Sequence, residues 1–319
     1  PTRRSSDLHP FPEKLAVEFL TGLDEVLCLE ELDPVIEREL IYICGKYHLN
    51  TKIIGKLSGD TACAGENTRD SVSNYIHTFL GLDTSKAQEL PEPPALPVRP
   101  PVLCAGCPHR ASFYAVKTAM KGKKTIFCGD IGCYTLGNAM PLDMVDTCLC
   151  MGAGLNIAQG VEKVEPDTTC FAFVGDSTFF ASAITGVVNA VYNQANMVLV
   201  VLDNSTTAMT GHQPHPGTGR TVMGEIVQKI NIEQVLREIG VTEIETINPL
   251  ELEASVSCVK RMAEKSGVRA IIFKAPCIAV TKPKAPLHVD QGSCIGCKKC
   301  IRDLGCPAIV MNDEKICID

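Results

Sequence analysis

Two polar residues each follow an apolar run of the chain, and their types and spacing suit a bound metal ion. Asp176 follows the run CFAFV within Gly175-Asp176-Ser177, and Asn204 follows the run MVLVVL, with 27 residues between the Asp and the Asn. Because both runs are typical of buried parallel strands, both side chains are expected at the carboxyl edge of one sheet, where open α/β sheets bind ligands. The alternative is two unrelated polar strand ends, which explains a single residue better than a pair.

Oxygen atoms at this edge predict a magnesium–diphosphate site. Mg²⁺ prefers octahedral oxygen ligands and combines those of the protein with water and substrate phosphates. Asp176 and Asn204 would supply two ligands, and the backbone carbonyl of Thr206 would supply the third. The Gly175-Asp176-Ser177 turn, followed by a helix, would also present backbone N–H groups and a positive dipole end to phosphate.

Spaced cysteines form a second kind of constellation. Cys104-x-x-Cys107 fits a metal site or an iron–sulfur cluster, although a redox dithiol or unligated thiols remain open. The far end of the chain carries four cysteines with a Pro after the last, a strong cluster signature for which a zinc knuckle is the alternative. These four are Cys294, Cys297, Cys300 and Cys306, and the cysteines expected in the core are Cys28, Cys44, Cys148, Cys150, Cys170 and Cys258.

Composition narrows the class of protein. A length of 319 residues suggests two or three domains, and 45% hydrophobic residues suffice for an ordinary globular core. A net charge of −7 argues against a nucleic-acid surface, and neither a long apolar run nor a signal peptide indicates a membrane, so a cytoplasmic protein is expected. In such a chain, 17 cysteines indicate metal or redox sites rather than disulfides.

Alternating helix and strand patterns must position these residues. Residues 9–83 predict a small βαβ-type unit, 84–101 a Pro-rich linker, 102–286 a second α/β domain, and 287–319 a Cys-rich tail. In the second domain, β-rich apolar runs predict a parallel sheet covered by helices on both faces. Its expected strands are 125–128, 170–174, 197–202 and 270–274, and its expected helices are 111–120, 154–164, 180–193, 232–239 and 249–265.

The two ends and one acidic run carry no predicted chemistry. Residues 1–8 show no pattern typical of a helix or a strand, and they match a translated sequencing adapter. The chain stops at Asp319 just as a second Cys-rich half would begin, so we expect an internal piece of a longer protein. Glu30, Glu31 and Asp33 are expected to form a strand end and a helix cap, with Asp33 as the cap.

The motifs resemble those of the thiamine-diphosphate enzymes, which carry GDG, a spacer of similar length and then NN. This chain departs from that pattern at Ser177, which replaces the final Gly, and at Asp203, which precedes Asn204. Residues 9–319 also carry TTAMTGHQPHPGTG, CAGCPHR, GDIGCYTLG, CMGAGLNIAQG and CIGCKKCIRDLGCPAI, and are similar to the 2-oxoacid:ferredoxin oxidoreductases, nearest the branch that oxidises indolepyruvate. The resemblance implies an α/β thiamine-diphosphate-binding fold, preceded by part of a transketolase C-terminal-like domain and followed by a truncated ferredoxin-like α+β tail.

The resemblance also implies which residues hold the cofactor and a proximal cluster. Cys133 and Cys277, in an Ala-Pro-Cys turn, would complete a [4Fe–4S] cluster with Cys104 and Cys107, and Cys128 is a weaker substitute for Cys133. Thiamine diphosphate and Mg²⁺ would be bound by Gly132, Tyr134, Gly152, Gly175, Asp176, Ser177, Asn204 and Thr206.

Ferredoxin-type [4Fe–4S] clusters are implied for the tail. In two-cluster ferredoxins the fourth Cys of each half ligates the other cluster. Cys294, Cys297 and Cys300 would therefore serve one cluster and Cys306 the other, and both clusters would lack ligands in the chain as cut. Cys317 is interpreted as a non-ligand because it falls in an expected strand.

Basic side chains near these motifs are candidates for catalysis. His109 and His212 lie beside Pro or Gly in loops and are expected to contact the substrate or the diphosphate, while His215 and Arg220 are weaker candidates. Arg110 would pair with a substrate carboxylate or a phosphate, or else lie solvated on a helix face.

The reaction implied by the resemblance is oxidative decarboxylation of an aryl 2-oxoacid such as indolepyruvate. The cofactor acts as the electron sink, electrons pass through the clusters to ferredoxin, and the acyl group leaves on coenzyme A. A beta subunit is the implied partner, and the glutamate that contacts the aminopyrimidine lies upstream of this piece, which alone should be inactive. Two alternatives remain open: a non-redox thiamine-diphosphate decarboxylase, and a ferredoxin-like electron-transfer module.

Overall fold

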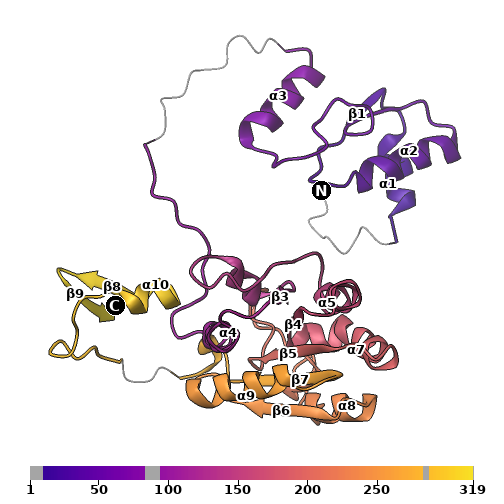
Figure 1. Ribbon diagram of the computed structural model, residues 1–319. Helices are drawn as coiled ribbons and strands as arrows, with labels where there is room; N and C mark the ends of the chain where they lie inside the picture. The colour runs from indigo at the N-terminus through magenta and orange to yellow at the C-terminus, as the bar shows by residue number, and fades with distance from the viewer. Residues whose placement is uncertain (1–9, 83–93, 283–286, 319) are drawn as a thin grey trace. The chain divides into compact units, whose positions relative to one another are not determined.

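The computed structural model describes residues 10–82, 94–282 and 287–318. The chain divides into two compact units, residues 1–97 and 98–319, and each is considered by itself (Figure 1). The expected adapter stretch at residues 1–8 and residues 84–93 of the expected linker lie outside the described residues, whereas residues 94–101 have no regular secondary structure. Within the described residues, every helix is too short or too polar to cross a lipid bilayer.

The first unit is a small α/β arrangement around one apolar cluster. Strands β1 (Glu25–Leu27) and β2 (Lys52–Ile54) pair in parallel. Leu20, Leu40 and Ile43 are buried between these strands and the helices that carry the three residues. Leu20 is on α1 (Glu13–Leu20), and Leu40 and Ile43 are on α2 (Val35–Tyr47). A further helix, α3 (Arg69–Phe79), has no buried residue.

The acidic run of this unit has a structural role, as expected, but through a different residue. The carboxylate of Glu30 accepts hydrogen bonds from the backbone N–H groups of Ile36 and Glu37 at 2.7 and 3.0 Å, so it satisfies the free donors at the start of α2. The expectation that Asp33 caps this helix is wrong. Its carboxylate instead pairs with the Arg38 guanidinium at 2.8 Å, on the exposed side of the helix.

The second unit is built on a five-stranded sheet, and the expected parallel sheet with helices on both faces is confirmed (Figure 1). The strand order is β3-β4-β5-β7-β6, and every neighbouring pair is parallel. Alternation along β4 sends Phe171 and Phe173 to one apolar cluster and Cys170, Ala172 and Val174 to the other. The strands are β3 (Thr125–Cys128), β4 (Thr169–Gly175), β5 (Met197–Asp203), β6 (Glu243–Ile247) and β7 (Val268–Lys274).

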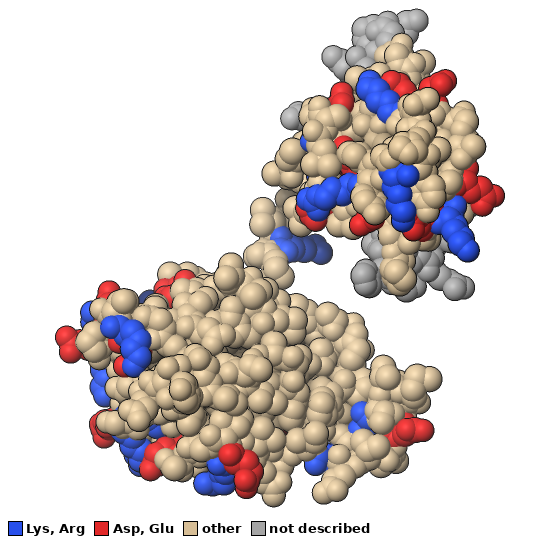
Figure 2. Space-filling model, turned by 90° about the vertical axis from the view of Figure 1, so that its right-hand side faces the viewer, with Lys and Arg blue, Asp and Glu red and all other residues tan. Residues whose placement is uncertain are grey.

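Helices cover the two faces of this sheet. One face is packed by α4 (Pro108–Ala119) and α9 (Leu252–Glu264), which contact each other. The other is packed by α5 (Ala153–Val164), α7 (Ile184–Tyr192) and α8 (Ile232–Ile239). Figure 2 shows the side of the unit that carries these last helices, and the centre of that side is uncharged, in agreement with the charge-free sequence of α7.

Most expected elements of this unit are confirmed, with one strand missed. The edge strand β6 (Glu243–Ile247) was not expected, because its sequence EIETI places charges on the solvent side of a half-buried strand. The expected helix 180–193 begins earlier: α6 (Asp176–Thr178) starts directly after β4 and continues through a π-helical segment, Phe179–Ala183, into α7.

The Cys-rich tail is a short helix followed by a hairpin. α10 (Lys299–Leu304) precedes the antiparallel strands β8 (Ile309–Asn312) and β9 (Lys315–Ile318). Among the cysteines expected in the core, Cys28, Cys44, Cys170 and Cys258 are buried, but Cys148 and Cys150 are exposed. The expectation for these two is wrong because they lie in a loop before α5 and not within the helix itself.

Candidate active site

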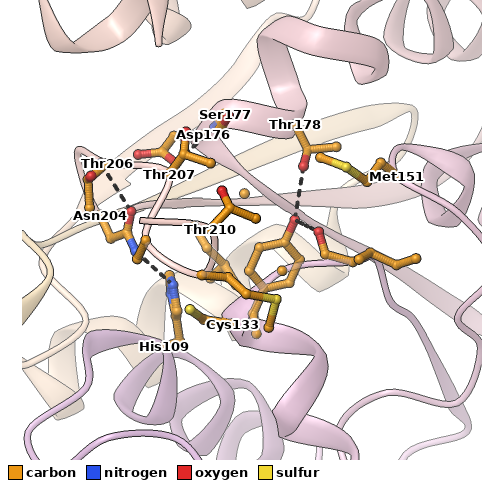
Figure 3. A pocket seen from close by; sticks show the side chains of 17 residues that line it. His109, Cys133, Met151, Asp176, Ser177, Thr178, Asn204, Thr206, Thr207 and Thr210 are labelled. Atoms are coloured by element: carbon orange, nitrogen blue, oxygen red, sulfur yellow. Dashed lines mark hydrogen bonds between the residues drawn. The ribbon is translucent and has the colours of Figure 1, made fainter. Parts of the chain in front are cut away.

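A pocket opens where β4 and β5 end, at the carboxyl edge of the sheet (Figure 3). It contains the expected metal-binding residues Asp176, Asn204 and Thr206 together, as parallel pairing of the two strands requires. Four other residues expected at the cofactor also line it: Gly132, Tyr134, Gly175 and Ser177. So do the expected catalytic residue His109 and the expected cluster ligand Cys133. Gly152 is not a lining residue, although its neighbour Met151 is.

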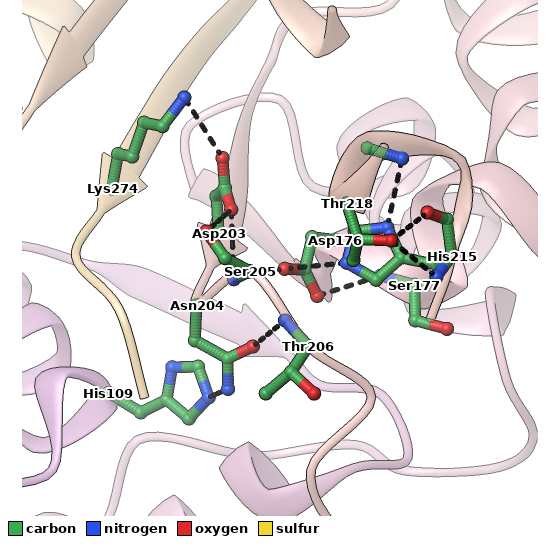
Figure 4. Close-up of polar contacts among 11 residues, drawn as sticks. His109, Asp176, Ser177, Asp203, Asn204, Ser205, Thr206, His215, Thr218 and Lys274 are labelled. Atoms are coloured by element: carbon green, nitrogen blue, oxygen red, sulfur yellow. Dashed lines mark hydrogen bonds and ion pairs between the residues drawn. The ribbon is translucent and has the colours of Figure 1, made fainter. Parts of the chain in front are cut away.

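Asp176 begins the helix that follows β4 and is held by backbone donors. Its Oδ1 accepts the N–H of Ser177 at 2.8 Å, and its Oδ2 accepts the N–H of Ser205, after β5, at 2.7 Å. The side chain is only 3% exposed. The carboxylate thus links the ends of both strands, and each of its oxygens keeps lone-pair capacity for a cation (Figure 4).

Asn204 is oriented by contacts on both sides of its amide. Its Oδ1 accepts the N–H of Thr206 at 3.2 Å, and its Nδ2 lies 3.1 Å from Nε2 of His109 (Figure 4). Burial lowers the pKa of His109 to about 4, against a smaller opposing effect of the Asp176 charge. His109 is therefore neutral near pH 7, and its ring fixes the asparagine amide without adding a charge beside the carboxylate.

Asp203 stands where the resembling family has an asparagine. Its Oδ2 lies 3.6 Å from Nζ of Lys274, and its Oδ1 accepts the N–H of Ser205 at 3.1 Å. Burial raises the pKa of Asp203, and the charge of Asp176 raises it further, while Lys274 opposes both effects. The lysine thus offsets only part of the effect of placing a second carboxylate beside Asp176, and the pKa of Asp203 stays raised.

Tyr134 forms one wall of the pocket through a buried network. Its hydroxyl donates to Oδ2 of Asp130 at 2.7 Å, and the other carboxylate oxygen accepts the N–H of Gly152 at 2.7 Å. A Cβ on Gly175 would lie 2.6 Å from the Tyr134 ring, so only glycine permits this close approach. Asp130 was not predicted, although it lies in a second Gly-Asp pair, which was the available signal.

His215 is a second residue whose importance the sequence understated. Its Nδ1 accepts the N–H of Gly217 at 3.2 Å, which leaves the ring proton on Nε2, and Nε2 lies 3.2 Å from Oδ2 of Asp176. This Nε2 has no aligned acceptor among the described residues, so the contact is electrostatic and not a well-formed hydrogen bond. By contrast, the expected catalytic residue His212 is exposed and does not line the pocket.

Four cysteines lie in one neighbourhood beside the pocket. The pKa of Cys133 is raised by burial and by the nearby thiols of Cys277 and Cys104. Burial raises the pKa of Cys107 to about 11. The backbone N–H of Cys277 donates to the carbonyl of Asn204 at 2.9 Å, which ties this cysteine to the strand end that carries the site. A four-ligand cluster stays a prediction, because the described residues contain no ready-made set of three or more metal-binding His, Cys, Asp or Glu side chains.

The tail cysteines separate into two groups. Cys294, Cys297 and Cys300 line one cavity with apolar neighbours, and Cys306 is not among its lining residues. Hydrogen bonds from the backbone N–H groups of Ile316 and Gly296 lower the pKa of Cys294. This sulfur is therefore placed to carry negative charge, as a thiolate ligand must.

Arg110 does not reach the pocket. Its guanidinium donates to backbone carbonyls of Leu103, Leu304 and Gly305, so neither the substrate or phosphate role nor the solvated helix face expected from the sequence describes it. Arg220 is exposed, and its Nη1 donates to the carbonyl of Gly224 at 3.3 Å.

The residues present suit Mg²⁺ with a diphosphate cofactor. The pocket gathers hard oxygen donors from Asp176, Asn204 and Thr206, which are the ligand type that Mg²⁺ prefers. The start of α6 lies at the same place and offers backbone N–H groups to phosphate. The apolar side chains of Ile131, Met151 and Met209 also line the pocket, together with the hydroxyl-bearing Thr178, Thr207 and Thr210.

Comparisons with known proteins agree with this description. Residues 130–273 match the family described as "Thiamine pyrophosphate enzyme, C-terminal TPP binding domain". The chain is 41% identical over 318 residues to "Indolepyruvate oxidoreductase subunit IorA" of Methanothermobacter thermautotrophicus, covering 98% of this chain and 51% of that protein. It is 32% identical over 124 residues to "2-oxoglutarate synthase subunit KorB" of Archaeoglobus fulgidus, covering 37% of this chain and 46% of that protein.

A solved structure also shares the fold. It is the 2-oxoglutarate:ferredoxin oxidoreductase from Magnetococcus marinus with 2-oxoglutarate, coenzyme A and succinyl-CoA bound, at a TM-score of 0.51 and 18% identity. The match covers 65% of this chain and 80% of that one, and it supports the arrangement of the sheet and its helices. The chain spans about half the length of the curated relatives it matches.

Proposed function

Since this chain belongs to the indolepyruvate oxidoreductase subunit family and carries its thiamine-diphosphate-binding fold, we propose that it is the diphosphate-binding part of a 2-oxoacid:ferredoxin oxidoreductase. The whole enzyme would oxidise aryl 2-oxoacids such as indolepyruvate to the aryl-acetyl-CoA. Coenzyme A, ferredoxin and a beta subunit would be its partners. The observation that carries the proposal is the joint placement of Asp176, Asn204 and Thr206 in one pocket beside Cys133.

In this proposal the oxygen donors of the strand ends hold the cofactor. The Asp176 carboxylate, the Asn204 amide oxygen and the Thr206 carbonyl would bind Mg²⁺, which in turn binds the diphosphate. Thiamine diphosphate, when bound, supplies the electron sink for loss of CO₂ from a 2-oxoacid. The fixed backbone donors to Asp176 would keep the ligand set in place before the cofactor arrives.

His109 and the apolar wall would orient the substrate. His109 is neutral and buried, and its Nε2 accepts a hydrogen bond from Nδ2 of Asn204 at 3.1 Å, so it would hold its own proton at Nδ1 and keep the amide oxygen of Asn204 turned toward the metal. Ile131, Met151 and Met209 supply apolar surface that favours an aromatic substrate side chain over a charged one.

The cysteines support the oxidative over the non-oxidative alternative. Cys133 lines the cofactor pocket, and the thiols of Cys104 and Cys277 are close enough to affect its pKa. These residues would hold a [4Fe–4S] cluster that takes electrons one at a time, and the tail cysteines would hold ferredoxin-type clusters. A simple decarboxylase would have no use for such thiols at its pocket, and an electron-transfer module would have no use for Asp176 and Asn204.

The proposal is tested on the purified full-length enzyme under anaerobic conditions. We expect reduction of a dye acceptor that requires both a 2-oxoacid and coenzyme A, with indolepyruvate preferred over 2-oxoglutarate. Release of CO₂ without dye reduction would instead establish a non-redox decarboxylase. Dye reduction from reduced ferredoxin alone, with no response to any 2-oxoacid, would establish an electron-transfer module.

A further inference from the structure

Arg110 lies in the first turn of α4, and its guanidinium joins segments that are far apart in the sequence. Its Nη1 donates to the carbonyl oxygens of Leu304 and Gly305 at 2.6 and 2.9 Å, and its Nη2 donates to the carbonyl oxygen of Leu103 at 2.5 Å. The side chain is 7% exposed, and it makes no ion pair with any described residue. Three carbonyl oxygens accept hydrogen bonds from this buried cation. The guanidinium is therefore held in one position, because a buried charge without partners would cost a large free energy.

The joined carbonyls belong to the residues directly before two candidate cluster ligands. Leu103 precedes Cys104, and Gly305 precedes Cys306. Nη1 and Nη2 belong to one rigid planar group. The backbone beside Cys104 and the backbone beside Cys306 are therefore held apart by little more than the width of one guanidinium.

A second contact holds the tail at the same place on α4. Gly305 ends α10 with a φ of 55°, and a Cβ at this position would lie 2.3 Å from Cδ of Pro141. Lys117 lies two helical turns after Arg110 on the same face of α4, and its Nζ donates to the carbonyls of Pro141 and Leu142 at 2.6 Å. Helix α4 thus holds the tail directly through Arg110 and indirectly through the segment that Lys117 anchors.

We propose that Arg110 is a positioning residue that sets the gap between the Cys104 site and the Cys306 site, and thereby the rate at which electrons pass into the tail. The inference rests on the proposed function, because it takes iron–sulfur clusters at both sites as donor and acceptor. Each transfer oxidises the donor and reduces the acceptor by one electron, and no bond forms or breaks. Since electron tunnelling falls steeply with distance, a tail that moves away from α4 would receive electrons more slowly.

Hydrogen exchange on the metal-free chain tests whether Arg110 holds the tail against α4. In Arg110→Met, which keeps an unbranched apolar stem but removes every donor, we expect amides of residues 299–308 to exchange on the order of tenfold faster. The exchange rate in Arg110→Lys should lie between those of Arg110→Met and the wild type. An ammonium keeps the charge but cannot reach from the Leu103 carbonyl to the carbonyls of Leu304 and Gly305. Amides of β4 and β5 should be unchanged in both.

Arg261→Met is the matched control. Arg261 is on α9 of the same unit, and its guanidinium pairs with Glu245 at 2.6 Å on the exposed surface. Its loss should leave the exchange of residues 299–308 as in the wild type. Wild-type exchange of that segment in Arg110→Met would overturn the proposal.

A variant on the tail side covers the case in which Arg110→Met fails to fold. Gly305→Ala places a methyl group against Pro141 and strains a left-handed residue, while leaving the sheet and its core intact. We expect the same local increase in exchange over residues 299–308. Unchanged exchange in Gly305→Ala would show that the tail is not held against this face of α4, and would overturn the proposal as well.

The electron path is tested on the full-length enzyme with its clusters. In Arg110→Lys we expect the 2-oxoacid to reduce the cluster beside the cofactor at the wild-type rate, with onward reduction of the ferredoxin-type clusters slowed about tenfold in rapid-freeze electron paramagnetic resonance. If the ferredoxin-type clusters are reduced at the wild-type rate although the tail exchanges faster, Arg110 does not set the distance between the two sites. If the wild type shows no reduction by any 2-oxoacid, the proposed function fails, and the exchange results on docking are unaffected.

Discussion

Removing the hydroxyl of Tyr134 should destabilise the second unit, because this hydroxyl satisfies a buried carboxylate. The Tyr134 hydroxyl donates to Asp130 at 2.7 Å, and Asp130 is 1% exposed. Tyr134→Phe leaves that oxygen without its donor. A hydrogen bond to a charged group contributes about 1.5–3 kcal/mol, so the free energy of unfolding should fall by about that amount.

Urea denaturation measures this change. With a slope of about 1–3 kcal/mol per M, the midpoint should fall by roughly 1 M while the slope stays the same. Tyr192→Phe is the control, since the Tyr192 side chain is 84% exposed on α7 and its variant should stay within about 0.5 kcal/mol of the wild type. Equal midpoints for Tyr134→Phe and Tyr192→Phe would refute the view that the Tyr134–Asp130 contact fixes the pocket wall.

Two further predictions concern the histidine that faces Asp176 and the burial of two cysteines. His215→Ala should weaken Mg²⁺-dependent binding of thiamine diphosphate about tenfold in the full-length subunit, because Nε2 of His215 faces the Asp176 carboxylate, whereas His212→Ala should leave the affinity unchanged. In the metal-free native chain at pH 8, iodoacetamide should modify exposed Cys150 well before buried Cys258, whose pKa burial raises to about 12. Mass spectrometry that finds Cys258 modified as fast as Cys150 would contradict its burial.

The sheet that positions the site could be predicted from the sequence because its central strands are continuous apolar runs. The runs CFAFV and MVLVVL predict both strands, and they also predict the sheet edge at which Asp176 and Asn204 meet. The edge strand β6 could not be found in the same way, because one side of an edge strand faces solvent and its charges hide the apolar alternation.

Long-range side-chain contacts could not be predicted. His215 stands between Pro214 and Pro216 and His212 between Gly211 and Gln213, but this difference does not indicate that the loop turns His215 toward Asp176 and His212 to solvent. Likewise, the sequence motif around Arg110 suggests ligands near that motif, whereas two of the three acceptors of Arg110 lie almost two hundred residues later, in the tail. The local sequence pattern therefore indicates candidate residues, but only the tertiary contacts show which of them reach the site.

The central claim is that Asp176 and Asn204 hold the metal and diphosphate, and calorimetry on the full-length subunit tests it most directly. The wild type should bind thiamine diphosphate in the presence of Mg²⁺, and Asp176→Ala should bind it at least about hundredfold more weakly, because loss of a ligand should cost more than loss of a residue that supports one. Asp167→Ala, an exposed residue before the opposite end of β4, should bind as the wild type does. Wild-type affinity in Asp176→Ala, or no Mg²⁺-dependent binding by the wild type, would contradict the assignment of the site.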